Sequence, residues 1–150
     1  MKRRGFLAIA TALLGVGPRG ARAQIAAIDP AIQQITGGAR IQSDRVKLEL
    51  PVIADNGNAV ALKVSVQSPM TAADYVKTIH LVSDRNPMRH MAAFHFGPHS
   101  GRAELATRVR LAGSQTVTAL AQMSDGTFWM DRARVQVALG ACIDESDWNK

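Results

Sequence analysis

Cys142 is the only cysteine among the 150 residues of this sequence, and it lies eight residues from the carboxyl terminus, in the run RVQVALGACIDESDWNK. A thiolate is a good sulfur nucleophile, and a thiol placed beyond the last strand can serve as a covalent carrier. Two other interpretations are open, because a single thiol has no partner within the chain. The cysteine is then either buried as a small hydrophobic residue or paired with a second chain.

A second group of potentially reactive side chains lies in the run NPMRHMAAFHFGPHS. Its members are Met88, His90, Met91, His95 and His99, with His80 upstream. Thioether and imidazole groups are ligands for copper, so segment 88–99 offers an alternative function as a periplasmic immunoglobulin-like binding or copper-handling module. The spacing matches no metal motif, and on a strand Phe94 and Phe96 face the core while His95 points away. We therefore predict no metal site and no cofactor.

The amino-terminal segment MKRRGFLAIATALLGVGPRGARAQ has the features of an export signal. Arg3 and Arg4 precede an apolar run, and Ala21-Arg22-Ala23 is a small-x-small cleavage sequence. The paired arginines followed by Gly-Phe-Leu favour the twin-arginine pathway over an ordinary secretory signal. We expect a twin-arginine signal peptide at 1–23 and a periplasmic mature protein. The apolar run is too short for a membrane anchor.

Removal of the signal peptide changes the charge of the protein. Five of the 18 basic residues and none of the 12 acidic ones lie in residues 1–23, which leaves 13 basic residues and a net charge of +1. A mature chain with so little net charge gives no electrostatic reason to bind nucleic acid or an anionic membrane surface. Its length suits a single domain.

The elements that position Cys142 are predicted to be strands. One short helix comes first, because Asp29-Pro30 suits a helix start and Gly37-Gly38 a helix end. From residue 45 on, polar and apolar residues alternate, and DNGN at 55–58 predicts a tight hairpin turn. The expected strands are 45–53, 60–66, 75–83, 91–96, 104–111, 116–123 and 127–139.

About seven short strands with almost no helix predict an all-β protein, an immunoglobulin-like antiparallel β-sandwich at 24–139. An eight-stranded barrel is the structural alternative. After the last strand, Gly140-Ala141 is expected to release the chain. Residues 140–150 would then form a carboxyl-terminal arm that carries Cys142.

Two long stretches carry a resemblance to a known family. They are LPVIADNGNAVALKVSVQSPMTAADYVKTIHLVSDRNPM and FHFGPHSGRAELATRVRLAGSQTVTALAQMSDGTFWM. This sequence resembles SoxY, the sulfur-carrier subunit of the periplasmic Sox thiosulfate-oxidation system, from about Val46 to Cys142. The most specific parts are SPMTAADYVKTIH and AQMSDGTF.

The resemblance implies a carrier and not an enzyme, with no catalytic residues of its own. It implies an immunoglobulin-like sandwich, a heterodimer with SoxZ, and covalent attachment of sulfur intermediates to Cys142. The transient partners would be a c-type Sox cytochrome that conjugates thiosulfate to the carrier, a hydrolase that releases sulfate, and a sulfane dehydrogenase. All of these are expectations about this chain.

The tail departs from the SoxY pattern, in which the cysteine lies in a bare Gly-Gly-Cys-Gly-Gly arm. Here Ala141 and Ile143 flank Cys142, and DESDWNK follows. Branched and aromatic side chains widen the arm, and Ile143 stiffens it. The carboxylates of the tail disfavour both the thiolate and an approaching thiosulfate dianion. We therefore expect the tail to slow the usual carrier reaction.

Overall fold

The computed structural model of this protein describes residues 29–141. Within that range the chain forms one short α-helix, one 3-10 turn and nine strands. No helix among these residues is long and apolar enough to cross a membrane. The prediction of a mostly-β protein with a short amino-terminal helix is confirmed, whereas the immunoglobulin type of the sandwich stays a prediction.

The elements follow one another along the chain in this order: α1 (Pro30–Thr36), β1 (Ile41–Gln42), β2 (Val46–Glu49), β3 (Ile53–Asn56), η1 (Gly57–Ala59), β4 (Val60–Val66), β5 (Val76–Ser83), β6 (His90–His95), β7 (Glu104–Val109), β8 (Gln115–Met123) and β9 (Phe128–Leu139). The strands expected from residue 60 onward are all present, and none of their ends differs from the prediction by more than two residues. The two-residue strand β1 and the separate strand β3 were not predicted.

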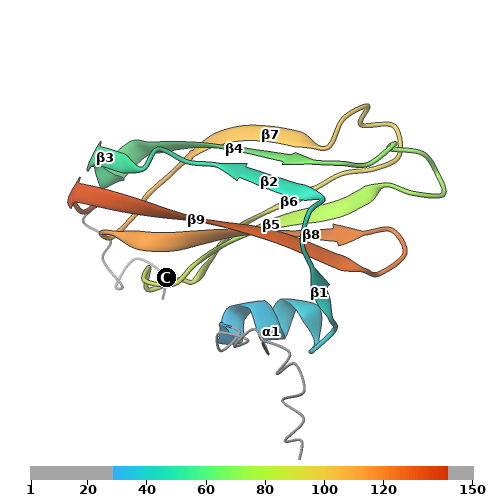
Figure 1. Cartoon of the computed structure of the whole chain (residues 1–150), viewed down its shortest axis with the longest axis horizontal. Coiled ribbons are helices and arrows are strands. Elements are labelled where there is room, and N and C mark those ends of the chain that lie inside the picture. Colours follow the sequence, from blue (N-terminus) through green and yellow to red (C-terminus); the bar gives the residue numbers. More distant parts are fainter. Residues whose placement is uncertain (1–28, 142–150) are drawn as a thin grey trace, which may run out of the picture.

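The strands form two sheets that face each other. The larger sheet has the order β1-β9-β8-β5-β6, with β3 also paired to β9, and the smaller one has the order β2-β4-β7. Figure 1 shows the smaller sheet above the larger one, with α1 on the outer side of the larger sheet. Side chains from both sheets make one core, in which Val64, Leu81 and Val135 are fully buried.

The helix α1 begins and ends where the sequence predicts. The Asp29 carboxylate accepts a hydrogen bond from the Ala31 backbone N at 2.9 Å, and Pro30 occupies the first turn. Gly37 ends the helix with a φ of 61°, a backbone angle that glycine adopts without strain. Ile32 anchors the helix on the larger sheet, where it packs in a small second core.

The first two predicted strands pair as expected, but the tight hairpin turn predicted at 55–58 does not form. β2 and β4 are antiparallel, with Val46 opposite Val66 and Glu49 opposite Lys63. Residues 53–56 instead form β3, which runs parallel to the end of β9, and the chain then makes the 3-10 turn η1. The Asn-Gly signal was outweighed because β3 satisfies its backbone hydrogen bonds with a strand far away in the sequence.

Three neighbouring strands of the larger sheet, β5, β8 and β9, have one of their ends at the same end of the sheet. β5 and β9 both run antiparallel to β8, with Ser83 close to Val117 and Val135 opposite Gln115. The segments after β5, before β8 and after β9 therefore meet at one end of the molecule. That end carries the residues just before Cys142.

Candidate functional site

The expected attachment residue, Cys142, lies outside the described residues, as do the tail at 143–150 and the signal peptide at 1–23. The described chain ends at Ala141, the residue that precedes the thiol. Ala141 is only 7% exposed, and its backbone N donates a hydrogen bond to the carbonyl oxygen of Leu111 at 2.9 Å. The fold therefore fixes the chain up to the residue before Cys142.

Leu111 is the centre of this anchor. Its side chain is fully buried, and its backbone N donates to the carbonyl oxygen of Gly57 at 2.8 Å. Three distant segments thus meet at one backbone position, since Leu111 binds Gly57 with its N–H and Ala141 with its C=O. We call Gly57, Leu111 and Ala141 the anchor junction.

Glycine is required at two places beside the junction. A Cβ at Gly57 would overlap the carbonyl oxygen of Leu111 and lie 2.9 Å from the backbone N of Ala141. A Cβ at Gly140 would overlap the carbonyl oxygen of Ala112. Backbone atoms cannot move away as a flexible side chain can, so a larger residue at either position would separate the segments.

A buried asparagine holds Leu111 from both sides. Asn86 is 7% exposed, and its Nδ2 donates to the carbonyl oxygen of Arg110 at 2.8 Å. Its Oδ1 accepts from the backbone N of Ala112 at 3.0 Å and from Nε2 of Gln115 at 3.1 Å. The Ser83 hydroxyl, bonded to Gln115, completes a buried polar network. Sequence reasoning missed this network, because no motif marks it.

The chain does not leave the domain at Gly140-Ala141 as the sequence predicts. Ala141 is hydrogen-bonded and buried, so the described chain is still anchored two positions beyond the end of β9 at Leu139. The chain is held here because the buried N–H of Ala141 needs an acceptor, which Leu111 supplies.

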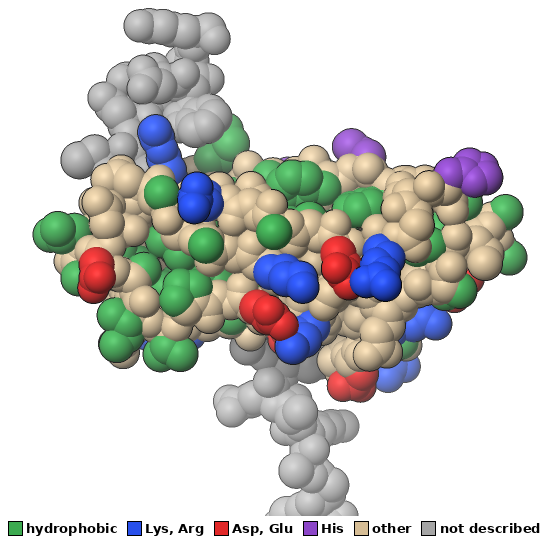
Figure 2. Space-filling view, turned by 90° about the horizontal axis from the view of Figure 1, so that it is seen from above, with side chains coloured by type: hydrophobic (Ala, Val, Ile, Leu, Met, Phe, Trp, Pro, Cys, Tyr) green, Lys and Arg blue, Asp and Glu red, His purple; other side chains and the backbone are tan. Residues whose placement is uncertain are grey.

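Exposed apolar residues gather at the same end of the molecule. Val52 is 73% exposed, Ile53 64% and Leu139 69%. β3 pairs with the end of β9, which places Ile53 beside Gln136 and Asn56 beside Leu139. Figure 2 shows apolar side chains at this end with an acidic one among them, and most of the charges of both signs in view lie nearer the middle of the face. Apolar surface of this kind is typical of an interaction site.

The side chains of the Met/His segment at 88–99 do not come together at one site, because they contact different parts of the domain. Met91 packs against the main core, and its Sδ lies 3.4 Å from Nδ2 of Asn86. His95 Nδ1 pairs with the Thr78 hydroxyl at 3.2 Å, while Phe94 packs on the core as expected. Among residues 29–141, no group of three or more His, Cys, Asp or Glu side chains could hold a metal ion.

His80 and His90 are the two imidazoles of this segment that meet. Nδ1 of His80 lies 3.1 Å from Nε2 of His90, and the ring centroids are 5.1 Å apart. Burial, followed by the nearby His90 and His95, lowers the pKa of His80 to about 4. His80 is therefore neutral near pH 7, and it pairs with His90 on the outer face of the larger sheet.

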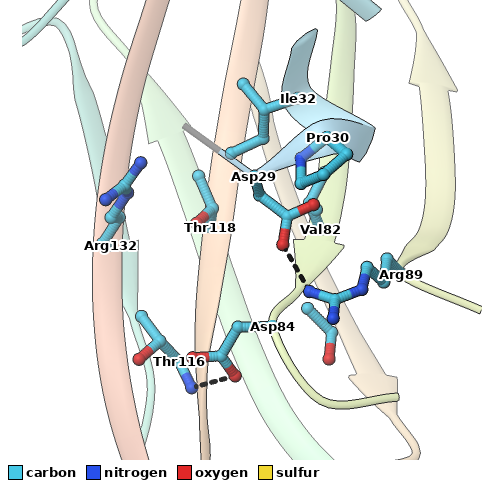
Figure 3. Close-up of a pocket in the computed structure, with 10 residues that line it drawn as sticks. Asp29, Pro30, Ile32, Val82, Asp84, Arg89, Thr116, Thr118 and Arg132 are labelled. Atoms are coloured by element: carbon cyan, nitrogen blue, oxygen red, sulfur yellow. Dashed lines mark hydrogen bonds and ion pairs between the residues drawn. The ribbon is translucent and has the colours of Figure 1, made fainter. Parts of the chain in front are cut away.

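A pocket of about 450 Å³ lies between α1 and the larger sheet. Figure 3 shows that Asp29 and Arg89 close one side of it through an ion pair of 2.6 Å, while Arg132 stands on the opposite side. Asp84 accepts from the Thr116 backbone N at 2.9 Å at the lower rim. Two acidic and two basic side chains balance each other there, so the pocket has no clear preference for an anion or a cation.

Solved structures similar to this chain include a carrier and several enzymes. The sulfur carrier protein SoxY from Chlorobium limicola f thiosulfatophilum has a TM-score of 0.61 and 24% identity, over 73% of this chain and 94% of that one. A superoxide reductase (neelaredoxin) from Ignicoccus hospitalis follows with a TM-score of 0.56 and 20% identity, over 63% of this chain and 80% of that one. The superoxide reductase from Nanoarchaeum equitans gives 0.54 and 12%, over 64% of this chain and all (100%) of that one.

These likenesses establish the fold, which both a carrier and reductases share, and a shared fold does not decide between functions. No curated protein matches the chain. The family model of the sulfur oxidation protein SoxY, however, matches residues 32–142, which is most of the chain. A carrier rather than an enzyme is thereby assigned, and a role in sulfur oxidation with it. The chain belongs to the SoxY family of sulfur oxidation proteins.

Proposed function

We propose that this protein carries sulfur intermediates covalently on the thiol of Cys142 while partner proteins oxidise and hydrolyse them. The observation that supports this most directly is the family match, which extends through residue 142 and so includes the only cysteine of the chain. The anchor junction adds a physical reason, because it holds the residue before Cys142 in one place.

The first step would join thiosulfate to the carrier. The Cys142 thiol loses one proton and, together with thiosulfate, gives up two electrons to a c-type cytochrome partner as the sulfur–sulfur bond forms. The product is a cysteine S-thiosulfonate with one negative charge. Water then attacks the terminal sulfonate on a hydrolase, which releases sulfate and leaves a persulfide on Cys142. A sulfane dehydrogenase would oxidise the remaining sulfur.

The anchor limits how far the thiol reaches. Consecutive Cα atoms are about 3.8 Å apart, so the Cα of Cys142 stays within that distance of the buried Ala141. A partner must therefore approach this end of the domain closely, or the bond between Ala141 and Leu111 must open. The arm at 140–150 would then be anchored at its second residue, Ala141.

The apolar end of the molecule suits a close partner. Val52, Ile53 and Leu139 lie at the end that carries Ala141, and a stable partner would cover them. We propose that this partner is a SoxZ-type chain, in a heterodimer built on an immunoglobulin-like sandwich. Export by a twin-arginine signal at 1–23 would place the complex in the periplasm, with the carrier domain at 24–139 and the arm at 140–150.

The function is tested by reconstituted thiosulfate oxidation with the SoxZ-type chain and the Sox partners. Cys142→Ser should abolish turnover, because a hydroxyl cannot form the sulfur–sulfur bond. Ser146→Ala, a change of similar size in the same tail, serves as the matched control and should retain turnover. Full activity of the Cys142→Ser variant would refute the carrier function. A chain that fails to co-purify with the cognate SoxZ would refute the partner assignment alone.

A further inference from the structure

Arg85 lies beside the anchor junction, in the segment after β5. Its guanidinium occupies the space that a side chain at Gly113 would fill, since a Cβ there would lie 2.9 Å from both Cζ and Nη1 of Arg85. Nη1 also donates to the carbonyl oxygen of Ser114 at 3.3 Å. The Arg85 guanidinium therefore packs against the segment that leads from Leu111 into β8.

The same segment touches the chain just before the thiol. The backbone N of Gly113 lies 3.5 Å from the Cβ position of Gly140, two residues before Cys142. The Ser114 hydroxyl accepts from the backbone N of Val137 at 2.9 Å, which fixes the end of β9 against it. Two residues of extended chain span at most about 7 Å, so Cys142 starts from within that distance of Gly140.

Arg85 has no carboxylate partner among residues 29–141. The ion pairs there join Arg45 to Asp74, Lys47 to Glu49 and Arg89 to Asp29. Asp84 is next to Arg85 in the chain, but its carboxylate accepts from the backbone N of Thr116. The Arg85 side chain is exposed, and of its five N–H donors the described residues occupy one.

We propose that Arg85 is a binding residue for the anionic head group of the sulfur species that reacts with, or is carried on, Cys142. This inference rests on the proposed carrier function. The ligand class is a sulfur oxyanion, either free thiosulfate or the sulfonate end of the S-thiosulfonate. A guanidinium presents a flat row of N–H donors that fits such oxygens, and its positive charge attracts the anion.

The test compares two thiol reagents of nearly the same size, neutral iodoacetamide and anionic iodoacetate. In each case the Cys142 thiolate displaces iodide, so thiolate formation affects both rates equally. The ratio of the iodoacetate rate to the iodoacetamide rate therefore reports the electrostatic potential at the thiol. It is measured on the full-length chain, reduced, for the wild type, Arg85→Gln, Arg85→Lys and Arg102→Gln.

Arg102 gives the matched control. It is an exposed arginine just before β7, whereas Leu111 follows the other end of that strand. In water, a unit charge changes the rate ratio about threefold at about 7 Å and about twofold at about 10 Å. We expect Arg85→Gln to lower the ratio about two- to threefold at low salt, with a smaller effect at high salt. Arg85→Lys should retain most of the ratio, and Arg102→Gln should leave it unchanged.

An unchanged ratio in Arg85→Gln overturns the assignment of Arg85 and leaves the carrier function standing. The same holds if both rates change in equal proportion, because Arg85 would then act on thiolate formation or on access to the thiol and not on the anion. If Cys142 of the native wild type reacts with neither reagent, the thiol is inaccessible and the proposed carrier function fails together with this inference.

Discussion

The backbone N of Ala141 and the carbonyl oxygen of Leu111 are joined by a 2.9 Å hydrogen bond, one residue before the only cysteine of the chain. Leu111 is bonded in turn to Gly57 at 2.8 Å, so the thiol is attached to the body of the protein at a point where three segments meet. The physical properties of this point decide how Cys142 is presented.

Gly57→Ala should open the anchor junction. The new Cβ would meet the carbonyl of Leu111 and the backbone N of Ala141, and overpacking of this kind costs about 1–3 kcal/mol in the free energy of unfolding. Gly97→Ala is the control, because a Cβ there meets nothing within 4 Å. Urea unfolding should find a loss only at position 57, together with faster alkylation of Cys142. Equal stability of the two variants would show that the close approach is not rigid.

Asn86→Ala should loosen the segment that carries Leu111. The variant leaves the carbonyl of Arg110 and the N–H of Ala112 without their partner, and unsatisfied buried groups cost about 1–3 kcal/mol each. Asn58→Ala removes an exposed asparagine and should stay within about 0.5 kcal/mol of wild type. Chemical denaturation measures both. A loss at Asn86 no larger than at Asn58 would contradict the role of the network.

Much of the fold was predictable because its signals are local. Asp29, Pro30 and Gly37 mark the ends of α1 by side-chain type, and alternation such as that of Val60 to Val66 marks the strands. Cys142 could be identified as a candidate because it is the only thiol and follows the last strand. The family resemblance then gave the role that residue types alone left open.

The anchor junction was not predictable in this way. Gly57, Leu111 and Ala141 are far apart in the sequence and meet through backbone atoms, which leave no side-chain pattern. Gly57 did give a signal, but the Asn-Gly step is shared with tight turns, and the long-range pairing of β3 with β9 decided the outcome. Asn86 is one polar residue in a loop, and its burial appears only when the loop packs on the start of β8.

The half-buried His80 should make stability depend on pH in a definite direction. Its pKa in the folded state is about 4, below the ordinary histidine value of 6.5. The unfolded chain therefore binds more protons between these values, so the contribution of His80 is fully present above pH 6.5 and is lost as the pH falls toward 4. His80→Gln should flatten this part of the profile relative to His99→Gln, as measured by urea unfolding between pH 7 and pH 4. Identical slopes would contradict the burial of a neutral imidazole.

The tail at 143–150 should slow the carrier reaction. Replacing Ile143–Lys150 with Gly-Gly removes a wide Trp148 and three carboxylates, each of which opposes a close negative charge by about 1 kcal/mol in water. We expect faster thiosulfate-dependent turnover in the reconstituted assay. Changing only Asp144, Glu145 and Asp147 to amides separates charge from width, because a charge effect shrinks at high salt. Slower turnover after replacement would identify the tail as a docking element.

Intact-mass spectrometry of the protein from thiosulfate-grown cells shows whether Cys142 carries sulfur. The chain is purified without reductant, measured, reduced and measured again, beside a Cys142→Ser variant from the same growth. We expect adducts of sulfur and sulfonate on the wild type that reductant removes, and none on the variant. A wild-type chain that is unmodified under thiosulfate oxidation, or a variant that carries the same adducts, would show that Cys142 is not the sulfur carrier.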